Sequence, residues 1–129
     1  SDGRLKKDIQ PLTHALDSIL QLEGKTYRWK EGATFADKKD IGLIAQEVEQ
    51  IFPELVAENE QGYKGIAYSK LTAVLVEAIK EQQGQMTAQQ DQITALEKEN
   101  TQLKALVEGQ MEALLARVAM LEGESLAAN

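Results

Sequence analysis

The chain has 129 residues, a formal net charge of −7 and a sequence pI near 4.8. This acidic balance argues against a nucleic-acid partner, because nucleic-acid binding depends on basic patches. The absence of cysteine excludes disulfides, cysteine-ligated zinc and thiol catalysis. No apolar run approaches the roughly 18 residues of a membrane-spanning helix, so we expect no membrane partner.

The first 40 residues predict a helix, a strand and a loop. Pro11 suits a first helical turn, and apolar residues then recur at helical spacing as far as Gly24, a typical C-terminal cap. The alternating residues 25–30 predict a strand, and the polar residues 31–40 predict a hairpin or an exposed loop. His14 is the only histidine, and we interpret it as a helix-surface residue rather than a ligand or base.

The next segments predict further short elements. Residues 41–44 predict a buried strand, and residues 45–52 predict a helix that the following proline stops. Residues 55–56 and 63–68 predict two more strands joined by a turn. We therefore expect an α+β head with short antiparallel strands over residues 1–68. Most of its aromatic side chains are expected in the core: Tyr27, Trp29, Phe52, Tyr63 and Tyr68.

The C-terminal part of the sequence carries a heptad repeat. Apolar or amide side chains recur in alternating steps of three and four residues, which is typical of a coiled-coil seam. We expect one long helix over residues 69–122, capped by Ser69, and a disordered tail at residues 123–129. The predicted seam comprises Ile79, Met86, Ile93, Leu96, Asn100, Leu103 and Val107.

The repeat leaves two properties of this rod open. Gln82, Gln89 and Asn100 are polar seam residues that fix register and strand number, but the seam composition does not distinguish a dimer from a trimer. Around Val107 the repeat takes two four-residue steps in succession, a stutter that contains Gly109. The helix either continues through Gly109 or breaks there.

Four blocks of the sequence follow one another in an order typical of one family. The blocks are SDGRLKKDI, YRW, IGLIAQEVEQIFPELV and GIAYSKLTAVLVEAIKE, and they extend over about residues 1–81. This part of the chain resembles the C-terminal intramolecular chaperone auto-processing domain of phage endosialidases, tailspikes and tail or neck fibres, which also occurs in myelin regulatory factor. Beyond Glu81 the rod is similar only in kind.

The resemblance implies a function. Such domains assemble as homotrimers, help the upstream β-rich stalk of the same chain to fold in register, and then cut themselves off through a Ser-Lys dyad in a single turnover. The family's serine falls on Ser1 and its lysine on Lys6, with the cut immediately before Ser1. The resemblance therefore implies a trimeric coiled coil and a phage fibre precursor in the host cytoplasm during virion assembly. It implies release of this domain from the mature fibre, and no metal or cofactor.

The chemistry of these residues agrees with that role. Serine is a poor nucleophile, and lysine serves as its base only when neutral, so the lysine pKa must fall from about 10.4 toward about 7–8. Arg4 and Lys7 beside Lys6 favour that change, whereas Asp2 would oppose it by pairing with Lys6. A chain that begins at Ser1 is the expected product of the cut, although a boundary chosen for expression would look the same. The competing interpretation is a non-catalytic coiled-coil adaptor.

Other candidate groups are weaker. Glu47 and Glu49 are two residues apart and face different sides of a helix, which argues against a paired-carboxylate site. We expect Gln46 and Glu47 to make structural contacts where the strand meets the helix. Phe35, in an otherwise polar loop, is a candidate contact for the upstream stalk.

Overall fold

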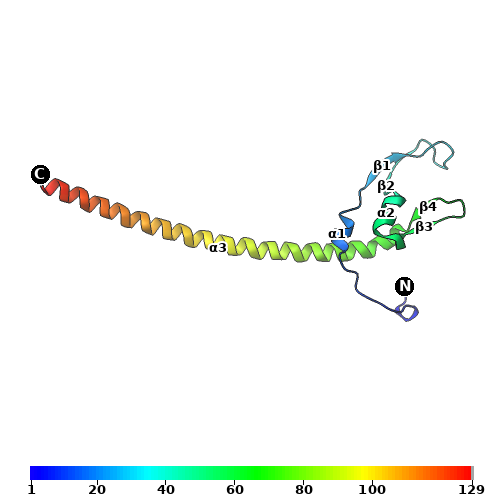
Figure 1. Ribbon diagram of the computed structural model, residues 1–129, viewed down its shortest axis with the longest axis horizontal. Helices are drawn as coiled ribbons and strands as arrows, with labels where there is room; N and C mark the ends of the chain where they lie inside the picture. The colour runs from blue at the N-terminus through cyan, green and yellow to red at the C-terminus, as the bar shows by residue number, and fades with distance from the viewer. Residues whose placement is uncertain (129) are drawn as a thin grey trace. The chain divides into compact units, whose positions relative to one another are not determined.

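The computed structural model describes residues 1–128 and shows short helices, two small antiparallel sheets and one long C-terminal helix (Figure 1). This is the α+β class that the sequence predicted. None of the helices in this range is both long and apolar enough to cross a membrane. The elements in chain order are η1 (Gly3–Leu5), α1 (Ala15–Ile19), β1 (Lys25–Arg28), β2 (Lys39–Gly42), α2 (Ala45–Ile51), η2 (Pro53–Leu55), β3 (Val56–Glu58), β4 (Lys64–Ile66) and α3 (Tyr68–Ala128).

Each sheet is an antiparallel pair of neighbouring strands. β1 pairs with β2, with Thr26 opposite Ile41, and β3 pairs with β4. The turn between β3 and β4 follows from its residue types: Gly62 takes a left-handed φ of 86°, which only glycine adopts freely. The Asn59 side chain accepts the N–H groups of Gln61 and Tyr63, which fixes the same turn.

The hydrophobic core joins α1, α2 and the first turns of α3. Its members on α3 are three and four residues apart, so they share one face of the helix. Core burial therefore ties the short N-terminal elements to the beginning of the long helix. The buried residues are Ala15, Leu16, Val48, Phe52, Leu55, Leu71, Val74 and Ala78.

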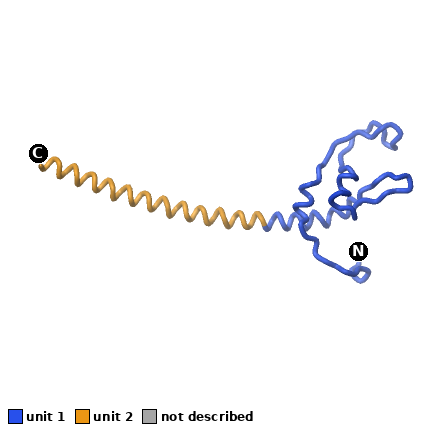
Figure 2. Tube along the Cα trace, in the orientation of Figure 1, with its two compact units in different colours: residues 1–84 blue, residues 85–129 orange. Residues whose placement is uncertain are grey.

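The chain divides into two compact units, Ser1–Gly84 and Gln85–Asn129 (Figure 2). The first unit contains the core and all of the strands that the structure describes. In the second unit, residues 85–128 are helical and their side chains are exposed. The predicted division into domains at residue 68 stays a prediction.

The first helix is shorter than the sequence predicted. It begins at Ala15 rather than near Pro11, because His14 adopts a left-handed φ of 57° that cannot continue a right-handed helix. The prediction of a helix running up to Gly24 was also wrong, because α1 ends at Ile19.

The last helix is longer than the sequence predicted. α3 passes through Gly84 and Gly109 without interruption, which decides between the two alternatives at the stutter. It also continues beyond Glu122 over residues 123–128, which we predicted to be disordered. Good helix formers in this stretch extend an existing helix at little cost. The last residue of the predicted tail, 129, lies outside the described residues.

The aromatic side chains of the head are less buried than predicted. Only Phe52 lies in the core, while Trp29, Tyr63 and Tyr68 are exposed. Each sheet has two strands, and a sheet of that width leaves much of its surface uncovered.

Candidate functional site

Ser1 and Lys6 lie next to each other at the N-terminus. The 3-10 turn η1 reverses the chain between them, with the Lys6 N–H donating to the Gly3 carbonyl at 3.0 Å. The Lys6 Nζ then donates a hydrogen bond to the Ser1 Oγ. The structure thus brings together the two residues named from the sequence, and their role as a catalytic pair stays a prediction.

Asp2 stabilises this turn and is engaged by Arg4. Its Oδ1 accepts the Arg4 backbone N–H at 2.9 Å, and its Oδ2 accepts from the Arg4 guanidinium at 2.7 Å. The Arg4 side chain, with its backbone N–H, lowers the pKa of the Asp2 carboxyl. The sequence left open a pairing of Asp2 with Lys6, which would oppose a neutral lysine. In the structure Asp2 pairs with Arg4 instead.

The segment that carries Ser1 and Lys6 is solvated in the single chain. Every residue from Ser1 to His14 is exposed, including the apolar Leu5 and Ile9. The folded head therefore does not cover this segment in the described structure.

The segment enters the head at α1, whose first turn is held by Glu81 of α3. The Ala15 N–H donates to Glu81 Oε1 at 3.1 Å and the Leu16 N–H donates to Oε2 at 2.8 Å. These bonds lower the pKa of the Glu81 carboxyl, with the Leu16 bond as the largest cause. Sequence reasoning missed Glu81, because no local signal links residues 65 positions apart.

The two glutamates of α2 hold lysines from different hairpins. Glu47 pairs with Lys25 of β1 at 3.0 Å, and Glu49 pairs with Lys64 of β4. Glu47 and then Glu23 raise the pKa of Lys25, and Glu49 raises the pKa of Lys64. These lysines are thus kept in their charged forms, and the predicted structural contact of Glu47 is confirmed.

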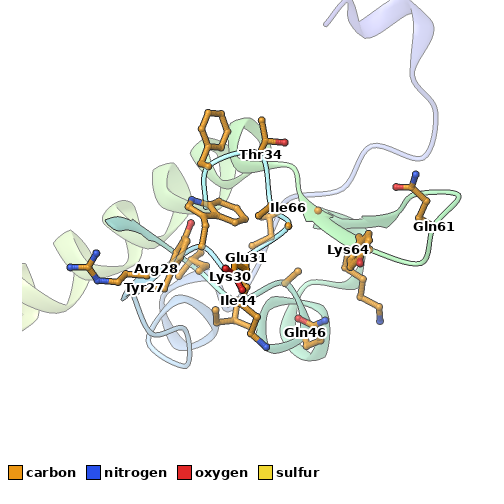
Figure 3. A pocket seen from close by; sticks show the side chains of 18 of the residues that line it. Tyr27, Arg28, Lys30, Glu31, Thr34, Ile44, Gln46, Gln61, Lys64 and Ile66 are labelled. Atoms are coloured by element: carbon orange, nitrogen blue, oxygen red, sulfur yellow. The ribbon is translucent and has the colours of Figure 1, made fainter. Parts of the chain in front are cut away.

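A hollow of about 1110 Å³ opens between the loop that follows β1 and the β3–β4 hairpin (Figure 3). Trp29 lies in its wall. Its ring is edge-on to that of Tyr27, with 5.3 Å between the ring centroids, and tilted to that of Phe35, with 6.4 Å between the centroids. Gln46 and Lys64 add polar groups. The lining residues include no serine, cysteine or histidine.

The predicted seam forms an exposed stripe on α3. Its apolar members are between 48% and 62% exposed, and Asn100 is exposed as well. An exposed apolar stripe of this length is typical of a helix that forms a coiled coil. The apolar members of this stripe are Ile79, Met86, Ile93, Leu96, Leu103 and Val107.

Comparison with known proteins places the head in a family. Residues 1–57 match the model of a peptidase family described as chaperone of endosialidase. These residues therefore belong to the chaperone-of-endosialidase family, as the sequence blocks predicted.

The relatives of the chain are phage fibre proteins. The long tail fiber protein Gp37 of Salmonella phage S16 is 32% identical over 114 residues, which cover 83% of this chain and 14% of that protein. The proteins of the same name from Enterobacteria phage K3 and Enterobacteria phage M1 are 37% and 34% identical over 62% and 63% of this chain. The chain spans 7% and 35% of these two proteins.

Proposed function

We propose that this chain is the self-releasing intramolecular chaperone of a phage tail fibre. Three copies associate through the seam of α3, guide the folding of the upstream stalk of the same precursor in the host cytoplasm, and leave it by a cut immediately before Ser1. The observation that carries the proposal is the hydrogen bond between Lys6 Nζ and Ser1 Oγ within a segment that matches the chaperone-of-endosialidase family. The similarity to long tail fiber proteins supports the proposal that the upstream stalk is part of a phage tail fibre.

The proposed reaction is an acyl shift followed by hydrolysis. Ser1 Oγ attacks the carbonyl carbon of the preceding residue while the neutral Lys6 Nζ accepts the hydroxyl proton. This proton passes to the Ser1 nitrogen as the C–N bond breaks, which leaves an ester on Oγ and a free α-amino group. Water then hydrolyses the ester, giving a carboxylate on the stalk and restoring the Ser1 hydroxyl.

Assembly supplies the environment that this chemistry needs. Burial favours the neutral form of a lysine, and only the neutral form accepts a proton. Since residues 1–14 are exposed in the single chain, we propose that neighbouring copies bury them in the trimer. The exposed side chains of Leu5, Ile9 and Leu12 are apolar groups that such a contact would bury. Cleavage should therefore follow assembly.

The experiment uses the longer chain encoded by the parent reading frame. Ser1→Ala should abolish cleavage, and Lys6→Arg should reduce it nearly as far, because a guanidinium stays protonated and cannot accept the serine proton. Both variants should still assemble, since neither residue lies in the seam. Gel analysis with mass spectrometry of the new N-terminus measures the cut, and light scattering measures the assembly. Lys7→Arg is the matched control and should be cut like the wild type.

Two results would count against the proposal. Cleavage of Lys6→Arg at the wild-type rate would exclude Lys6 as the base. Cleavage of Ser1→Ala at the same bond would exclude Ser1 and favour the second candidate function, a non-catalytic coiled-coil adaptor. The solvent exposure of residues 1–14 in the single chain is the observation that favours this second candidate.

A further inference from the structure

The beginning of α1 lacks a local cap. The first N–H groups of a helix have no partner within the helix, and a side chain just before the helix usually accepts them. His14 stands in this position with a left-handed backbone and makes no side-chain capping bond. The carboxylate of Glu81 takes this role from another helix, with one oxygen on the Ala15 N–H and the other on the Leu16 N–H.

This contact fixes the point at which the N-terminal segment leaves the head. Ala15 and Leu16 are buried in the core, whereas the preceding residues, 1–14, are exposed. The direction in which the segment departs is therefore set at residues 14–16. The position of the Ser1–Lys6 pair relative to the head depends on this anchor.

The same turn of α3 also carries the beginning of the predicted seam. Ile79 and Gln82 are seam positions on either side of Glu81, and Ile79 is exposed in the single chain. The backbone of a helical turn is rigid on the scale of these distances, so contacts at Ile79 and Gln82 would also fix the position of the Glu81 backbone. In the proposed trimer, side chains on one turn would thus face both a neighbouring copy and the residues where the N-terminal segment joins α1.

We infer that Glu81 is a positioning residue that links assembly of the rod to the placement of the Ser1–Lys6 segment. The inference rests on the proposed function, because it concerns the rate of the proposed cleavage. When the copies associate at Ile79 and Gln82, Glu81 holds α1 at a fixed place beside the assembled helices. The N-terminal segment of each copy then leaves at a defined angle and reaches the surface that buries it. Without the hydrogen bonds from α1 to Glu81, the first turn of α1 is held less rigidly. The N-terminal segment then leaves the head in variable directions, and the Ser1–Lys6 pair samples many positions.

The test compares Glu81→Gln and Glu81→Ala in the longer self-cleaving chain. A glutamine at this position keeps one acceptor oxygen and an alanine keeps none, so the cleavage rate per trimer should fall in the order wild type, Glu81→Gln, Glu81→Ala. The fall should reach about ten- to a hundredfold, the range that a small misplacement of reacting groups produces. Light scattering should show the same mass for all three chains.

The matched control is Glu77→Gln. Glu77 lies one turn earlier on α3, where its carboxylate forms an ion pair with Lys80 at 3.1 Å. This variant removes the same charge and should be cut at the wild-type rate. Rates are measured below the melting temperature of every variant, so that loss of folded protein does not contribute. Hydrogen exchange of the Leu16 amide in the Ser1→Ala background reports the anchor and should accelerate only in the Glu81 variants.

The outcomes separate the inference from the function on which it rests. If Leu16 exchanges faster but the rate per trimer stays at the wild-type value, Glu81 only stabilises α1 and the inference is overturned. The same holds if Glu77→Gln slows cleavage as much as Glu81→Gln does. If the wild-type chain is not cut at all while Leu16 remains protected, the proposed function itself has failed. A graded loss of rate at constant mass supports the inference.

Discussion

Gly42, the last residue of β2, lies against two tyrosine hydroxyl groups. A Cβ atom at this position would lie 2.9 Å from Tyr68 Oη and 3.2 Å from Tyr27 Oη. The Tyr68 hydroxyl accepts the Leu43 N–H at 3.0 Å, which ties the end of β2 to the first turn of α3. The tyrosine cannot retreat from an added methyl group without losing this bond.

We therefore expect Gly42→Ala to destabilise the head by about 1–3 kcal/mol, the usual range for overpacking. Urea unfolding followed by circular dichroism measures this loss. Gly24→Ala is the control, because a Cβ there meets no atom within 4 Å. Equal midpoints for the two variants would show that Tyr68 moves aside at no cost.

Glu81 predicts a dependence of stability on pH. Its pKa in the folded chain is lowered by the Leu16 and Ala15 N–H groups, and the nearby His14 acts in the same direction. A lowered folded-state pKa means that the contribution is complete above the pH at which an unfolded glutamate titrates, about 4.3, and is lost as the pH falls through the folded-state value.

The melting temperature of Glu81→Gln should therefore lie below that of the wild type at pH 7, and the difference should shrink as the pH falls below about 4.3. Thermal melts from pH 7 to pH 3 measure this difference. Glu77→Gln removes a carboxylate that pairs with Lys80 on α3 itself, and it should show no such convergence. A gap between wild type and Glu81→Gln that stays constant down to pH 3 would contradict the assignment of the bond to the ionised carboxylate.

At the scale of elements, α3 carries one buried and one exposed set of apolar side chains. Leu71, Val74 and Ala78 are buried in the core of the head. The seam stripe that begins at Ile79 is exposed in the single chain. A long helix with an uncovered apolar stripe gains most of its stability from packing, so we expect this face to be covered by other copies.

Ile93→Asp should therefore disrupt the assembly, because it places a charge in the middle of the seam. Light scattering at micromolar concentration should give a trimer mass for the wild type and a smaller mass for the variant. Ala95→Asp adds the same charge two residues away, outside the seam, and should leave the mass unchanged. A wild-type dimer mass would refute the trimer, and an unchanged Ile93→Asp mass would refute this seam.

At the scale of the whole molecule, the compact unit Ser1–Gly84 has a small core of eight buried residues. Domains of this size bury a limited fraction of their surface and are marginal alone. In the proposed assembly, association of the rod concentrates the heads and stabilises them by mass action. The head should then depend on the rod for its stability.

A chain that ends at Gly84 should accordingly be monomeric and should melt at a lower temperature than the full chain. Circular dichroism melts and light scattering on the two chains measure both properties. The melting temperature of the full chain should rise with protein concentration, and that of the shorter chain should not. A shorter chain with a trimer mass and an unchanged melt would show that the head holds the assembly together.

The sequence by itself determined the class of the fold and the position of most elements. Strand alternation, turn residues and the heptad repeat are local patterns, and the structure confirms β1, α2, β4 and the long helix near their predicted places. The ordered sequence blocks also predicted the family of residues 1–57 correctly. The local pattern predicted the wrong beginning for α1, because the left-handed backbone of His14 prevents the helix from starting before Ala15.

Only the tertiary structure decided which side chains meet. The sequence named Ser1 and Lys6, but the turn that joins them and the capture of Asp2 by Arg4 depend on backbone geometry that residue types do not fix. The bond from α1 to Glu81 connects residues 65 and 66 positions apart. Such a contact depends on how α1 packs against α3, and a linear pattern carries no information about that distance.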